Sequence, residues 1–250
     1  MTARHVIDFS EIARQDVGIV GGKNASLGEL LAALAPQGIN VPEGFATTAE
    51  AFRQFLVDNR LLKPIAGHLA EYHAGAITLA EAGKSIRTAI LGGQFPPEIE
   101  AAIRHAYRAM CAAAGRDDVD VAVRSSATAE DLPEASFAGQ QETYLNIRGE
   151  DDLIEACRKC YASLYTDRAI SYREAQGYEH EAVALSVGVQ RMIRSDEAGA
   201  GVMFSIDTEN GFPDVVLINA AWGLGETVVQ GTVNPDEYQV FKPLLDKPGL

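Results

Sequence analysis

The change from helices to sheet is decided by residues 118–128, which read DVDVAVRSSAT. Val119, Val121 and Val123 alternate with acidic or small residues, and this period of two predicts a half-buried strand that ends at Arg124. Hydroxyl side chains follow the arginine directly. This strand is the first one predicted in a chain whose early part is helical, and the other predicted strands come later.

Apolar residues follow a helical period in the first part. Four leucines recur at helical spacing within residues 24–34, and further helices are predicted over 49–59, 98–114 and 151–176, the last one broken once. Later segments alternate as strands do, over 185–189, 201–207, 214–221 and 237–242, with Asn210-Gly211 as a hairpin signal. The order predicts an α+β fold with an antiparallel sheet, divided into residues 1–189 and 190–250.

The charge balance excludes several classes of partner. The 250 residues include 21 Lys and Arg against 35 Asp and Glu, a formal net charge of −14. A protein needs a basic face to neutralise nucleic-acid phosphates or to bind an anionic membrane surface. We therefore expect neither nucleic acid nor membrane as a partner, although a local basic pocket for a small anion stays compatible with the sequence.

Targeting and disulfide signals are weak. No apolar run approaches the roughly 20 residues that span a bilayer, and the first residues do not resemble a secretory signal. Three cysteines make no disulfide framework. These observations favour a cytoplasmic protein.

Gly21-Gly22-Lys23 is a candidate phosphate-binding turn. The P-loop pattern fails, because Val17 stands where it needs glycine and Asn24 where it needs Ser or Thr. The two glycines still allow close approach of a ligand, and Lys23 stands where a helix begins, where free N–H groups favour an anion. An ordinary turn with a solvated lysine is the alternative.

Arg124 is a second candidate for binding an anion. Its guanidinium offers a fixed fork of donors that suits phosphate oxygens. The alternative is a surface loop in which Arg124 pairs with Glu130 or Asp131. Residues 136–143, SFAGQQET, lead into another strand, and this segment is either a backbone cradle for a polyphosphate or a simple turn.

Cysteine and histidine patterns point to no metal site. Cys157 and Cys160 form a C-x-x-C without further ligands, and on a helix they favour buried thiols over a redox pair. None of the five histidines has a partner at a metal-binding or catalytic spacing in the sequence.

Six segments together carry a family resemblance. They are VGGKNASLGEL (20–30), VPEGFATT (41–48), VRSSATAED (123–131), SFAGQ (136–140), NAAWGLGE (219–226) and VNPDEY (233–238). In this order they resemble the N-terminal nucleotide-binding domain of the phosphoenolpyruvate synthases, in the dikinase superfamily that also includes pyruvate phosphate dikinase and rifampicin phosphotransferase. The similarity covers residues 5–242.

The resemblance implies an ATP-grasp fold, in which two α+β subdomains close on ATP. It implies a protein that converts ATP, pyruvate and water into AMP, phosphoenolpyruvate and phosphate, through a phosphohistidine on a swivelling domain of the same full-length chain. Neither that histidine nor the pyruvate-binding barrel is within these 250 residues, so full turnover is not expected of this chain alone, which we interpret as a truncated ATP-grasp domain.

The resemblance also implies roles for particular residues. Lys23 and Arg124 match the family's phosphate-binding cations, and we expect both to act in catalysis. The segment that approaches the phosphates is matched by Gly139, Gln140, Gln141 and Thr143, and the hinge that lines adenine by Gln190 and Met192. The ligands of the expected Mg²⁺ lie beyond residue 250 in the family. The alternatives are a rifampicin-type antibiotic phosphotransferase and a nucleotide-binding fragment without catalysis.

Overall fold

The computed structural model describes residues 4–128, 142–245 and 247. The chain divides into two compact units, residues 1–192 and 193–250, and each is described by itself. Gln190 still belongs to the last strand of the first unit, so the division falls just after that strand and not at residue 189. Among the described helices, none has both the length and the apolar character that crossing a membrane requires.

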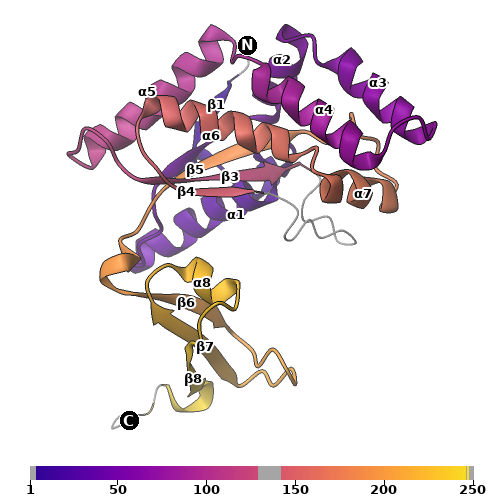
Figure 1. Cartoon of the computed structure of the whole chain (residues 1–250). Helices are drawn as coiled ribbons and strands as arrows, with labels where there is room; N and C mark the ends of the chain where they lie inside the picture. Colours follow the sequence, from indigo (N-terminus) through magenta and orange to yellow (C-terminus); the bar gives the residue numbers. More distant parts are fainter. Residues whose placement is uncertain (1–3, 129–141, 246, 248–250) are drawn as a thin grey trace. The chain divides into compact units, whose positions relative to one another are not determined.

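A five-stranded sheet forms the centre of the first unit (Figure 1). Its strands stand in the order β1-β2-β5-β3-β4, and every neighbouring pair is antiparallel. The bounds are Val6–Asp8 for β1, Gly44–Thr47 for β2, Val121–Ala127 for β3, Thr143–Ile147 for β4 and Leu185–Arg191 for β5. The predicted α+β class with antiparallel pairing is therefore confirmed.

The two faces of this sheet differ in chemistry. Val121 and Val123 of β3, with Val187 and Val189 of β5, are fully buried in the main core with the helices of one face. The alternate positions carry Arg124, Ser126, Ser186, Gly188 and Gln190 and face α1 on the other side. Figure 1 shows α1 below the sheet and α2, α4, α5 and α6 above it. One face therefore stabilises the fold, and the other presents polar groups.

The helices over the apolar face begin at clear sequence signals. α2 (Ala49–Asp58) starts after Thr48, whose hydroxyl accepts from the Ala51 N–H, and α4 (Leu79–Gly92) starts with a capping box between Thr78 and Glu81. The other two early helices are α3 (Leu62–His73) and α5 (Pro97–Ala113). The stretch predicted over 151–176 divides into α6 (Glu150–Ser163) and α7 (Asp167–Ala175), because the Thr166 hydroxyl caps a new helix.

Helix α1 (Val17–Leu34) is kinked at Gly21, whose φ of 77° is unfavourable for any other residue. Its leucines do not form the buried face that their spacing suggests. Leu30 is 45% exposed, and the side toward the sheet consists of Asn24 and small residues. Gly28 lies so close to the Ile12 carbonyl that a Cβ would collide with it, so close approach decides which face is buried.

The second unit is a three-stranded antiparallel sheet with one short helix. Strands β6 (Gly199–Phe204), β7 (Val215–Trp222) and β8 (Asp236–Phe241) stand in this order, and α8 covers Gly225–Val229. The hairpin predicted at Asn210-Gly211 is confirmed, with a longer connection than a two-residue turn. Asp207 organises it by accepting the Glu209 N–H at 2.8 Å.

Candidate functional site

A pocket of about 260 Å³ lies in the first unit between α1 and the polar face of the sheet. Three residues of the predicted site line it together, namely Lys23 from α1, Arg124 from β3 and Gln190 from β5. The rest of the lining is Phe9, Asn24, Ser26, Leu27, Leu30 and Gly188. The pocket thus combines two cations, amide and hydroxyl groups, and an apolar wall.

The kink at Gly21 brings Lys23 to this pocket. A side chain at Gly21 would collide with the backbone and hydroxyl of Ser126, so only glycine lets α1 approach β3 here. The chain returns to helical geometry after the kink, and the Asn24 N–H donates to Ser126 Oγ at 3.4 Å. The start of this helical segment therefore lines the pocket through Lys23 and Asn24, and the positive end of a helix dipole favours an anion there.

Arg124 is a partly buried cation of this pocket. Burial lowers the pKa of its guanidinium from the usual value. Among the residues that the structure describes, no hydrogen bond or ion pair joins this side chain to another group. Removing a charge from water without a partner is costly, so the site is suited to a ligand that brings negative charge.

Gln190 and Thr143 complete the same face of the sheet. The Gln190 side chain is 8% exposed and donates from Nε2 to the Pro42 carbonyl at 3.0 Å. Thr143 is exposed and stands directly opposite Arg124 in the pairing of β3 with β4. Opposed residues of antiparallel strands share a face, so Thr143 lies on the arginine's side, although it does not line the pocket.

Met192, another residue of the predicted site, does not line this pocket. It lies just beyond β5, where its N–H donates to the Asp120 carbonyl at 2.8 Å. Gly139, Gln140 and Gln141 lie outside the described residues, and so do Glu130 and Asp131, the alternative partners of Arg124.

Sequence reasoning missed several residues of the pocket. Helical spacing predicts Leu27 and Leu30 as core residues of a helix, yet they form part of the pocket's apolar wall. Asn24 has no predicted role in the site, yet it is 2% exposed and hydrogen-bonded to the sheet. A polar residue directly after the Gly-Gly-Lys turn was the available signal.

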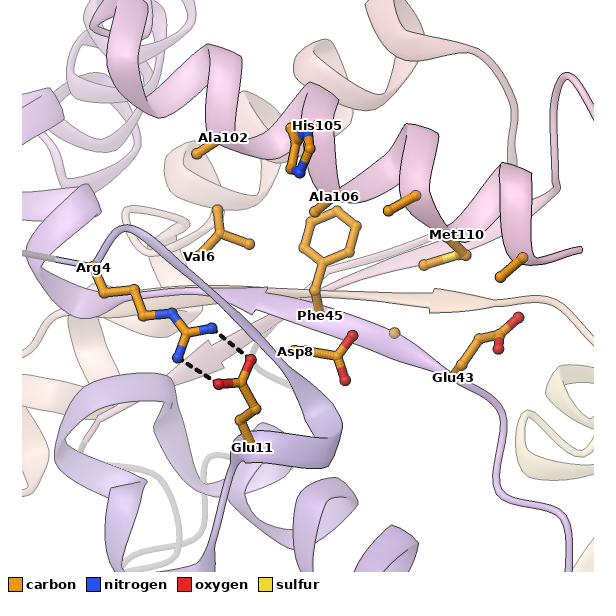
Figure 2. A pocket seen from close by; sticks show the side chains of 13 residues that line it. Arg4, Val6, Asp8, Glu11, Glu43, Phe45, Ala102, His105, Ala106 and Met110 are labelled. Carbon is orange, nitrogen blue, oxygen red and sulfur yellow. Dashed lines mark hydrogen bonds and ion pairs between the residues drawn. The ribbon is translucent and has the colours of Figure 1, made fainter.

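A larger pocket of about 440 Å³ lies between α5 and the strands β1 and β2. Figure 2 shows Asp8, Glu11 and Glu43 on one side of it and His105 with alanines of α5 on the other. Its arginine, Arg4, is paired with Glu11 at 2.6 Å. With its remaining carboxylates it is a poor place for a phosphate, and it contains none of the predicted site residues.

At the end of α3, His73 meets Glu174 and His180, which lie about 100 residues later in the sequence. His73 and His180 both face Glu174, at 2.8 and 3.5 Å from its Oε1 to the two Nε2 atoms. This His-Glu-His group has the donor atoms of a metal site, which the sequence spacing did not reveal. However, His180 Nδ1 accepts from Arg173 Nε at 3.0 Å, and its Nε2 is buried without a hydrogen bond to any described residue. The direct hydrogen bond in this group joins His73 of α3 to Glu174 of α7 at 2.8 Å, and the group is explained as a contact between these two helices.

The buried thiols agree with their sequence interpretation. Cys157 and Cys160 are fully buried in α6. Burial raises the pKa of the Cys157 thiol to about 12 and that of Cys160 well above its usual value. Neither has the exposed, electropositive environment of a reactive cysteine.

Comparison with known proteins agrees with the pocket's chemistry. The family described as "Pyruvate phosphate dikinase, AMP/ATP-binding domain" matches residues 17–247. The chain belongs to this family. Among its dikinase relatives, it is 57% identical over 245 residues to the phosphoenolpyruvate synthase of Synechocystis sp., and 55% identical over 241 residues to that of Escherichia coli. A probable phosphoenolpyruvate synthase of Methanocaldococcus jannaschii is 46% identical over 239 residues.

The chain spans only part of these dikinase relatives. The matched region covers 96% of this chain and 30% of the Synechocystis and Escherichia coli proteins, and 95% of this chain and 20% of the Methanocaldococcus protein. The comparisons thus identify an AMP/ATP-binding domain of dikinase type.

Proposed function

We propose that this chain is the ATP-binding part of a phosphoenolpyruvate synthase and that its two units are the two halves of an ATP-grasp domain. The complete protein would convert ATP, pyruvate and water into AMP, phosphoenolpyruvate and phosphate in the cytoplasm. The phosphohistidine and the pyruvate site would belong to other domains of that protein. The support is the family membership together with the pocket of the first unit.

One observation carries the proposal most strongly. Arg124 is a partly buried cation with no counter-charge among the described residues, and it shares its pocket with Lys23. A polyphosphate would supply the missing negative charge. Phosphoryl transfer is catalysed mainly by positioning the phosphates and neutralising their oxygens, and two convergent cations suit that task.

The remaining lining residues suit other parts of a nucleotide. Phe9, Leu27 and Leu30 offer apolar surface, and Gln190 offers an amide at the end of β5. The volume of about 260 Å³ is below the roughly 300–1,000 Å³ of small-molecule sites. We therefore propose that this pocket receives only part of the ATP molecule, with the phosphates toward Lys23 and Arg124. Met192 and Thr143, with Gly139, Gln140 and Gln141, would contact the nucleotide outside this pocket.

Magnesium does not fit the residues of this pocket. Its described lining contains no carboxylate, and Mg²⁺ is usually held by carboxylates together with substrate phosphates. The ligands that the protein contributes would lie elsewhere in the complete enzyme. We assign no step to a metal ion held by these residues.

The proposal is tested by calorimetric titration of the complete protein with Mg-ATP. Losing a hydrogen-bonding charge costs about 1.5–3 kcal/mol, so Arg124→Gln is expected to weaken binding by about tenfold to hundredfold. Arg53→Gln is the matched control, because Arg53 is exposed on α2, away from the pocket. Unchanged affinity of Arg124→Gln, or an unmodified protein that does not bind Mg-ATP, would overturn the proposal.

A further inference from the structure

Asn24 is a polar side chain buried where α1 meets the sheet. It is 2% exposed and follows Lys23 directly, so the two side chains leave the same turn of helix in different directions. The neighbouring buried residues of α1 are glycine, alanine or valine. A buried amide in such a place requires partners, because an unpaired polar group is costly away from water.

Its partners come from both central strands. Asn24 Nδ2 donates to Ser186 Oγ of β5 at 2.9 Å and to the Val20 carbonyl at 2.9 Å, and the Asn24 N–H donates to Ser126 Oγ of β3. Ser186 Oγ in turn donates to the Thr47 carbonyl of β2 at 2.5 Å. A single residue thus connects the turn after the Gly21 kink to three strands.

Gly188 provides the space for this contact. A Cβ at position 188 would collide with Asn24 Oδ1. The same glycine lines the pocket beside Arg124, its direct partner across β3 and β5. The pairing of Gly188 with Arg124 therefore fixes the position of the arginine and also leaves the space that the Asn24 side chain fills.

We propose that Asn24 is a positioning residue for Lys23. Its side chain, through Ser186, adds to the backbone N–H bond to Ser126 and holds the turn that carries the lysine at a fixed distance from the strand that carries Arg124. Both cations can then reach one phosphate chain. An apolar residue of similar size would fill the space without defining that geometry, whereas a network with satisfied partners does define it. The inference rests on the proposed ATP binding at this pocket.

The test is a double-mutant cycle on Mg-ATP affinity in the complete protein. Asn24→Ala is expected to weaken binding about tenfold in the native background and to have no further effect when Lys23→Ala is already present, as coupled residues do. Ser186→Ala, which removes the partner and leaves Asn24 in place, is expected to act in the same direction. Thermal melting of each variant verifies that the protein is folded at the temperature of the binding measurement.

Ser163→Ala is the matched control. Ser163 is 3% exposed and donates a buried hydrogen bond to the Cys160 carbonyl at 2.7 Å, away from the pocket. It should lower the melting temperature and leave Mg-ATP affinity unchanged. The positioning role would be overturned if Asn24→Ala weakened Mg-ATP binding equally with and without Lys23. It would also be overturned if neither Asn24→Ala nor Ser186→Ala changed the affinity. If Lys23→Ala and Arg124→Gln bind like the native protein, the proposed function itself fails.

Discussion

Arg124 and Gly188 stand directly opposite each other in the antiparallel pairing of β3 with β5, and both line the pocket. Opposed residues project to the same face, so the missing side chain at position 188 leaves room on the arginine's side of the sheet. Asn24 of α1 occupies part of that room. The close approach of α1 and the placement of the cations thus depend on the same glycine.

Gly188→Ala is expected to destabilise the first unit. The new methyl group would collide with the buried Asn24 amide, and overpacking of this kind costs about 1–3 kcal/mol. Chemical denaturation measures the loss. Gly67→Ala is the matched control, because Gly67 lies in α3 with open space around it and alanine there should add about 0.5–1 kcal/mol of stability. Equal stability changes in both variants would argue against the tight contact.

The free energy of unfolding is expected to decrease on acidification because of His180 and Glu174, which lie near the end of α3. Burial, followed by the charge of Arg173, lowers the pKa of His180 below its usual 6.5. The unfolded chain therefore binds a proton on this histidine more readily than the folded chain does, so stabilisation is complete above pH 6.5 and is lost as the pH falls below it. Glu174, whose pKa is also lowered by its hydrogen bond to His73, adds a further loss below pH 4.5.

Urea denaturation as a function of pH measures this effect. His180→Gln keeps a group that can accept from Arg173 without titrating, and it should reduce the decline in stability just below pH 6.5. The exposed His105 of α5 serves as the comparison, and His105→Gln should leave the decline unchanged. A native-like decline in the His180 variant would show that another group is responsible.

Cys157 and Cys160 are expected to resist alkylation in the folded protein. Only the thiolate reacts, and burial raises the pKa of Cys157 to about 12 and keeps the thiol from reagent and water. Mass spectrometry after iodoacetamide treatment should show modification of both thiols only once the protein is unfolded. Rapid labelling of the folded chain would contradict their placement in the core.

Local signals predicted much of the fold. The alternating valines before Arg124 predicted β3, and the structure extends that strand to Ala127. The break expected within 151–176 occurs where Thr166 caps α7. In contrast, β2 has four buried residues and therefore no alternation of apolar and polar side chains, and the helices α3 and α4 lie in a region where no pattern was singled out.

The sequence singled out the two cations of the candidate site but not its geometry. Local motifs indicated Lys23 and Arg124, the family resemblance implied Gln190, and all three line one pocket. The role of Asn24 depends on Gly188 and Ser186, which lie far along the chain, and helical periodicity favoured the leucines of α1 as its buried face. Close approach through Gly21 and Gly28 reversed that preference, and no local pattern contains this information.

In the proposed site, Arg124 binds the phosphates of ATP and not its nucleoside. This role is tested by comparing the dissociation constants of Mg-ATP and adenosine in the native protein and in Arg124→Gln. We expect the substitution to weaken Mg-ATP binding about tenfold or more and to leave adenosine binding unchanged. An equal loss for both ligands, or no loss for Mg-ATP, would contradict it.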